Sequence, residues 1–114
     1  DLTKLKQVIF NSPSFATVNN DLFNGCVLLT GQIIPATVTK IGKRAFNRCE
    51  SLTEIDLPNG LLSMGAEAFA NCTSLTTVGL PDGIKTYDKF FVGCTNLIAI
   101  KVNESNKLKT LFHN

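Results

Sequence analysis

The chain has 114 residues, enough for one domain, with 18% charged residues and a formal net charge of +2. Its basic residues are scattered, and the densest group (Lys40, Lys43, Arg44 and Arg48) has no interleaved aromatic platform, which argues for a solvated face and against a nucleic-acid-binding patch. No stretch reaches the roughly 18 apolar residues that a membrane-spanning helix needs. The chain starts at Asp1 without a leader, so we expect a processed product or an excised piece whose targeting signal is lost.

Cysteines recur at nearly constant intervals along the chain. There are four, separated by 23, 23 and 22 residues, and each follows a phenylalanine by three positions. They are Cys26, Cys49, Cys72 and Cys94. The two clearest copies of the surrounding pattern, 41–61 and 64–84, match almost residue for residue. A constant period in the twenties is typical of a solenoid, in which each repeat forms one coil and only stacked coils bury a core.

The repeat extends in both directions from these copies, so we expect one domain over 1–114 with about four and a half coils. Leu5, Val8 and Phe10 belong to a degenerate first copy, and the last copy follows one deletion near Lys89. The approximate coil boundaries are 1–17, 18–40, 41–63, 64–86 and 87–114.

Each coil is expected to contain one short strand. The pattern Leu52-x-x-Ile55-x-Leu57 ends in an apolar alternation of period two, which predicts a strand with Ile55 and Leu57 pointing inward. Pro58 ends the strand because it has no N–H to donate, and Asn59-Gly60 supplies a turn. Stacked coils would place these strands side by side in a parallel sheet.

Before each strand, the sequence predicts a short helix. Ala45, Phe46 and Cys49 place apolar side chains at i, i+1 and i+4, the spacing of one face of a helical turn. Each coil would therefore contain a strand, a turn, a connector and a short helix, with the helices on the side opposite the sheet. This is an α/β solenoid.

The repeated string resembles a known family. Ile-Gly-x-x-Ala-Phe-x-x-Cys-x-Ser-Leu-Thr-x-Ile-x-Leu-Pro stands at 41–58, and it returns with Met and Val substitutions at 64–81. It is similar to the BspA-type leucine-rich repeat, and the chain departs from that pattern at Gln32 and Asp88. The resemblance implies a leucine-rich repeat solenoid, a right-handed superhelix with a parallel sheet on its concave face and short helical turns on its convex face. Members occur in bacterial and protist surface proteins, with roles in adhesion or protein binding and no catalytic residues in the repeat.

The cysteines allow three interpretations: disulfides, a metal site or buried thiols. Neighbouring coils place equivalent Cα atoms about 4.8 Å apart, within disulfide range, but the parallel Cβ vectors disfavour the bond. Zinc sites need close cysteine pairs or added histidines, and the single histidine is His113, near the end of the chain. We therefore expect buried free thiols, no metal and no cofactor.

Candidate catalytic groups also have structural explanations. Ser51 and Ser74 lack a nearby base, so their hydroxyls are expected to bond backbone groups, a role that also suits Asn96 at the equivalent position. Glu54 and Asp56 share one strand face and could form a catalytic pair or a cation site. Because neither recurs in the next coil, a solvated surface is the preferred interpretation, and we expect no enzymatic activity.

Binding in a solenoid usually uses the sheet face. The strand alternation predicts an outward, concave row of protein-binding residues together with Gly31 and Gly79. The row is Gln7, Ile9, Ile33, Glu54, Asp56, Thr77, Ala99 and Lys101. The expected function is a cell-surface or secreted module that binds a host or matrix protein, and a cytoplasmic location stays open. The alternative is a structural spacer of a longer array, which self-associates through exposed solenoid ends at Leu2–Leu5 and Leu111–Phe112.

Overall fold

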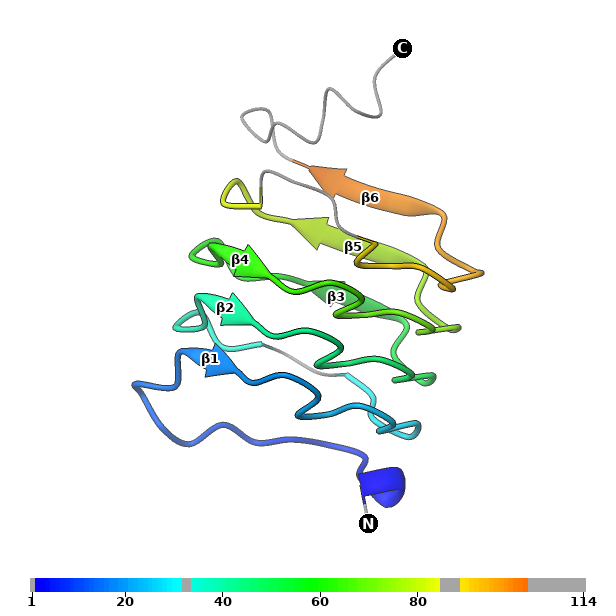
Figure 1. Ribbon diagram of the computed structural model, residues 1–114, viewed down its shortest axis with the longest axis horizontal. Coiled ribbons are helices and arrows are strands. Elements are labelled where there is room, and N and C mark those ends of the chain that lie inside the picture. The colour runs from blue at the N-terminus through cyan, green and yellow to red at the C-terminus, as the bar shows by residue number, and fades with distance from the viewer. Residues whose placement is uncertain (1, 32–33, 85–88, 103–114) are drawn as a thin grey trace.

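The structure is a stack of similar coils, in which the first described coil (blue) and the last described coil (orange) lie at opposite ends of the stack (Figure 1). It is a computed structural model, and it describes residues 2–31, 34–84 and 89–102. In chain order the elements are the 3-10 helix η1 (Leu2–Lys4) and the strands β1 (Thr17–Val18), β2 (Lys40–Ile41), β3 (Glu54–Asp56), β4 (Ser63–Met64), β5 (Thr77–Leu80) and β6 (Ala99–Val102). The expectations for Gln32, Ile33, Asp88, Leu111, Phe112 and His113 lie outside the described residues.

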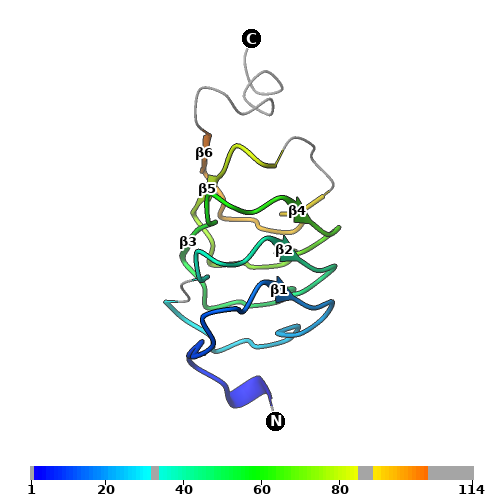
Figure 2. The same cartoon turned by 90° about the vertical axis from the view of Figure 1, so that its left-hand side faces the viewer.

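The strands form two parallel sheets, seen as two columns along the stack in Figure 2. One sheet has the order β3-β5-β6, as the sequence predicts. Its register pairs Glu54 with Thr77, one period of 23 residues away, and Thr77 with Ala99, which confirms the one-residue deletion before β6. The second sheet, β1-β2-β4, was not expected from the sequence. Its strands have only two residues each, too few for an alternating pattern to stand out.

The predicted inward residues of the strands are buried. Ile55 and Leu57 are 3% and 6% exposed, whereas Glu54 and Asp56 beside them are exposed. This alternation confirms the predicted strand and its inward face.

A column of phenylalanine rings runs through the core along the stacking direction. Ring centroids of Phe23 and Phe46 lie 5.2 Å apart, those of Phe46 and Phe69 lie 4.9 Å apart, and those of Phe69 and Phe91 lie 6.0 Å apart. These are stacked arrangements within the favourable range for aromatic pairs. Each ring therefore belongs to one coil but is buried by its two neighbours, which is why a single coil cannot bury its own core.

The predicted helices are a wrong prediction: no α-helix occurs in the described residues, and consecutive turns stand in their place. In the segment 43–49, every second N–H is used between coils. Arg44, Phe46 and Arg48 donate to carbonyls of the next coil at 3.1, 2.7 and 2.8 Å. The alternate N–H groups donate three residues back, as Cys49 does to Phe46 at 3.2 Å. A helix would need all these donors for its own ladder, so the stack replaces it with a ladder between coils.

Left-handed backbone residues at fixed positions also prevent helix formation. Two positions in each turn segment have φ between +54° and +83°. The first set is Asp21, Arg44, Glu67 and Lys89, and the second is Gly25, Arg48, Asn71 and Gly93. A right-handed helix requires negative φ throughout, so these residues end any helical turn after a few residues.

Candidate functional site

The outward face of the sheet β3-β5-β6 carries six of the predicted outward positions in two rows. Each row has one residue from each strand in register. The rows are Glu54–Thr77–Ala99 and Asp56–Gly79–Lys101. Except for Thr77 and Gly79, which are half-buried, these residues are exposed. The structure therefore brings these predicted residues together on one surface.

The second row places opposite charges on either side of a glycine. Asp56 and Lys101 lie on the outer two strands, so their Cα atoms are roughly 9–10 Å apart, two strand spacings. No salt bridge among the described residues involves either one. A Cβ built on Gly79 would lie 2.6 Å from Asp56 Oδ1, so the carboxylate leans over the glycine. Because Gly79 has no side chain, the Asp56 carboxylate fits above it, and the surface between the Asp56 and Lys101 charges is recessed.

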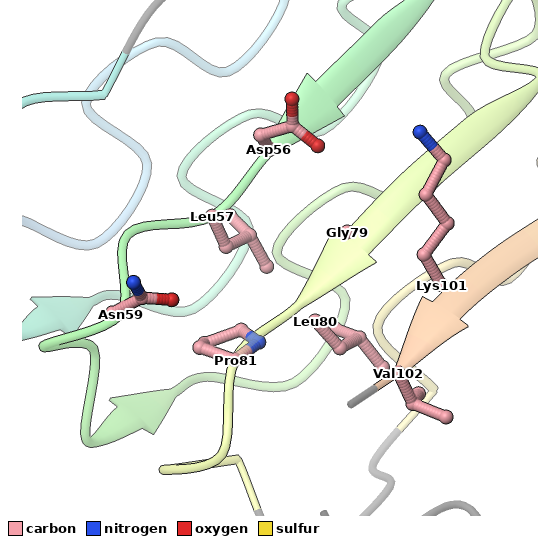
Figure 3. A pocket seen from close by; sticks show the side chains of 8 residues that line it. All are labelled: Asp56, Leu57, Asn59, Gly79, Leu80, Pro81, Lys101 and Val102. Atoms are coloured by element: carbon pink, nitrogen blue, oxygen red, sulfur yellow. The ribbon is translucent and has the colours of Figure 1, made fainter. Parts of the chain in front are cut away.

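A groove of about 360 Å³ opens where these three strands end (Figure 3). It combines the charged row with the apolar ends of the strands and with the turn that follows β3. Its lining residues are Asp56, Leu57, Asn59, Gly79, Leu80, Pro81, Lys101 and Val102. Of these, the sequence indicated only Asp56, Gly79 and Lys101 as surface residues. The proline-containing turns that follow β3 and β5 were the signal that could have placed Asn59 and Pro81 beside them.

The remaining predicted binding residues do not join this surface. Gln7 and Ile9 are exposed, Ile9 at 72%, but neither belongs to a strand. Gly31 is exposed and also lies outside the strands. Ile33 lies outside the described residues.

A second groove, of about 330 Å³, lies on the other sheet. Its lining is Thr17, Val18, Asn19, Asn20, Lys40 and Gly42, and no sequence pattern predicted it. One polar group there is already engaged in structure, because Asn20 Oδ1 accepts a hydrogen bond from the Lys43 N–H at 2.8 Å. This groove has no carboxylate opposite its lysine, in contrast to the groove at Asp56.

The cysteines form a column of free thiols beside the phenylalanine column. The Sγ atoms of Cys49, Cys72 and Cys94 donate to phenylalanine carbonyls of the preceding coil at 3.4, 3.2 and 3.1 Å. Burial, together with the neighbouring thiol of Cys26, raises the pKa of Cys49 to about 12. The Cys94 thiol is half-buried, and its hydrogen bond with the Cys72 thiol lowers its pKa. A protonated, buried thiol such as Cys49 is neither a nucleophile nor a metal ligand, so Cys49 packs in the core and links coils.

The serine and asparagine candidates also connect coils. Ser51 Oγ donates to the Val27 carbonyl at 2.7 Å, and Asn96 Nδ2 donates to the Thr73 carbonyl at 2.7 Å. Both bonds reach a backbone carbonyl one coil back, which confirms the structural role expected for these two residues.

Acidic neighbours pair with part of the densest basic group. Arg44 contacts Asp21 at 3.4 Å and Glu67 at 3.5 Å, and Arg48 contacts Glu50 at 3.8 Å. Asp21, Arg44, Glu67 and Lys89 occupy equivalent positions, so charges of alternating sign follow one another along the stack. This ladder favours the observed register of the coils and leaves less free positive charge for an external anion.

Within the described ranges, no group of three or more histidine, cysteine, aspartate or glutamate side chains could hold a metal ion. In the same ranges, no helix is both long enough and apolar enough to cross a membrane.

A comparison with known protein families identifies the repeat found in the sequence. A family model described as "BspA type Leucine rich repeat region (6 copies)" matches residues 2–113. No curated protein matches the chain.

Solved structures resemble the chain in fold. A leucine-rich repeat protein of T. pallidum superposes with a TM-score of 0.80 at 35% identity, covering 87% of this chain and 46% of its own. One from Bacteroides ovatus gives 0.77 at 37% identity, covering 86% and 25%. A leucine-rich cell surface protein of Faecalibacterium prausnitzii gives 0.62 at 23% identity, covering 84% and 31%, and shows the fold alone. The chain thus spans less than half the length of each of these proteins. With both the repeat pattern and the coil architecture matched, the chain belongs to the BspA-type leucine-rich repeat family.

Proposed function

We propose that the chain is a non-enzymatic, protein-binding module of a cell-surface or secreted protein, and that its partner contacts the outward face of β3, β5 and β6. The observation that carries the proposal is the row Asp56–Gly79–Lys101 beside the open groove. Two opposite charges, neither in a salt bridge with another described residue, flank a glycine without a side chain, and a protein segment with complementary charges fits such a surface.

The family supports an interaction role, since leucine-rich repeats present an extended sheet surface to other proteins. Adhesion to host or matrix proteins is the specific form that the resemblance suggests. Repeats of this family occur in surface proteins, where contacts with host or matrix proteins take place.

The composition of the face indicates weak individual contacts. Interface hot spots are usually Trp, Tyr or Arg in desolvated pockets, and neither row contains one of these residues. Charged, exposed groups such as Glu54 and Lys101 contribute more to association rate and specificity than to affinity. A longer array of coils would therefore gain its strength from several simultaneous contacts.

The test is binding of the purified chain to an immobilised panel of extracellular-matrix proteins and glycans at two salt concentrations. Asp56→Arg should abolish saturable binding, and higher salt should weaken it, because charged surface contacts are screened. Glu50→Arg makes the same change in charge outside both sheets and is the matched control. Equal loss in both variants would contradict a specific role of the sheet face. No binding across the panel would instead favour the structural-spacer function.

A further inference from the structure

We propose that Asn59 is a site of spontaneous chemical modification, where deamidation through a cyclic imide adds a negative charge to the rim of the groove. The chain has two Asn-Gly sequences, Asn24-Gly25 and Asn59-Gly60. Asparagine is among the chemically labile residues, and a following glycine leaves the next backbone nitrogen unshielded. The structure places these two pairs in opposite environments.

The reaction needs only water as co-reactant. The backbone N of Gly60 attacks Cγ of Asn59, a new N–C bond forms, and the Cγ–Nδ2 bond breaks. Ammonia leaves with the proton from the Gly60 nitrogen, giving a five-membered imide. Water then opens the imide at either carbonyl, which leaves an aspartate or an isoaspartate at position 59. No oxidant or reductant takes part.

The Asn59 environment permits the attack. Both Asn59 and Gly60 are exposed, at the centre of the turn closed by the Leu61 N–H donating to the Pro58 carbonyl at 3.0 Å. Among the described residues, no hydrogen bond engages the Asn59 side chain or the Gly60 N–H. Among the described residues outside its chain neighbours, the one heavy atom within 4 Å of a Cβ added to Gly60 is the Ala36 carbonyl oxygen, at 3.7 Å, so the neighbouring coil does not crowd the Gly60 backbone.

The Asn24 environment opposes the same attack at three points. Asn24 Nδ2 donates to Asp21 Oδ1 at 2.9 Å, and Asn24 Oδ1 accepts from Asn47 Nδ2 at 3.1 Å. The attacking group itself, the Gly25 N–H, donates to the Asn47 carbonyl at 2.8 Å within the ladder between coils. All three bonds must open before the nitrogen can reach Cγ. Because each bond contributes a modest stabilisation, we expect Asn24 to react on the order of tenfold to a thousandfold more slowly than Asn59.

The product changes the candidate binding surface. Asn59 and Asp56 line the same groove, so deamidation sets a second carboxylate near the first and lowers the formal net charge of +2 by one. In the next coil, the equivalent turn already carries an acid, Asp82, before Gly83. The modification therefore gives this turn the charge that its neighbour has by sequence.

The test is a time course of the folded chain at mildly alkaline pH and 37 °C, followed by tryptic digestion and fragment mass spectrometry. Cleavage after Lys6, Lys40 and Arg48 puts Asn24 and Asn59 on separate peptides, each read for the conversion of amide to acid. We expect acid to accumulate at Asn59 at least about tenfold faster than at Asn24. The same time course in denaturant removes the difference, because both Asn-Gly pairs are then free.

Two variants sharpen the result. Gly60→Ala should slow the reaction at Asn59 by shielding the nitrogen, and the space around Gly60 lets the variant fold. Asn47→Ala should speed the reaction at Asn24, because it removes one of the three restraints. Equal rates at Asn24 and Asn59 in the folded chain would overturn the proposal. So would an unchanged Asn59 over a period in which the denatured chain converts.

Discussion

Replacing Phe69 by alanine tests the aromatic column on which the stack depends. Phe69 is fully buried, and its ring stacks on Phe46 at 4.9 Å with an interplanar angle of 2° and on Phe91 at 6.0 Å. Truncating a buried phenylalanine costs about 3–5 kcal/mol, and both ring contacts are lost with it. A domain of this size has a total free energy of unfolding of about 5–15 kcal/mol, so the substitution removes a third or more of that free energy across most of the range. We expect the melting temperature to fall by roughly 10–25 °C.

The assay is urea and thermal unfolding followed by far-UV circular dichroism, with Phe15→Ala as the matched control. Phe15 is half-buried at the end of the column and contacts Phe10 at 4.9 Å, so its truncation should cost only about 1–2 kcal/mol. A loss below about 1 kcal/mol for Phe69→Ala would refute the packed column. A reduced urea dependence in that variant would show the coils unfolding separately.

Three further substitutions follow from the same structure. Gly42→Ala should lower the free energy of unfolding in urea by about 1–3 kcal/mol, because the added Cβ would lie 2.5 Å from the backbone N of Asn20. Gly60→Ala has room for its Cβ and should leave the stability nearly unchanged. Equal effects of the two substitutions would contradict the close contact between coils at Gly42. The pKa of Cys49 is raised to about 12 on folding from about 8.5 in the unfolded chain, so the folded state keeps the proton and stability falls as pH rises between these values, by up to about 1.4 kcal/mol per pH unit. Alkaline urea titrations should show a shallower fall in Cys49→Ala, and identical slopes would refute this assignment. Arg44→Ala should lose less than about 1 kcal/mol, since both its ion pairs are solvent-exposed, and a larger loss would make the charge ladder a main source of stability.

The strands could be predicted from sequence because their pattern has one physical cause. Ile55 and Leu57 alternate with Glu54 and Asp56, and only a strand buries one pair while exposing the other. The turn segments could not be predicted from sequence, because apolar residues at i, i+1 and i+4 fit a helix as well as they fit consecutive turns. What decides between them is hydrogen bonding to the next coil, as with the Phe46 N–H, and this becomes visible only in the stack.

The candidate surface was predictable in part for the same reason. Alternation and the 23-residue period placed Asp56 and Lys101 on the outward face, and the structure puts them in one row. The groove needed more than alternation, because the turn at Asn59 and the ends of β5 and β6 close it from different coils. The sheet also does not reach Gln7 and Ile9, because the degenerate first coil forms no strand around these two residues.

Surface and core are separable in this architecture, and that decides what the binding test can mean. Along β3, Asp56 is exposed while its neighbours Ile55 and Leu57 are buried, so a change at Asp56 leaves the packing between coils in place. Surface substitutions of this kind usually change stability by no more than about 0.5 kcal/mol. Each row also takes one residue from each coil, so Asp56→Arg alters one end of the charged row and leaves Gly79 and Lys101 where they are. A loss of binding in a variant that unfolds like the unchanged chain therefore reports the charge on the sheet face, and not the integrity of the solenoid.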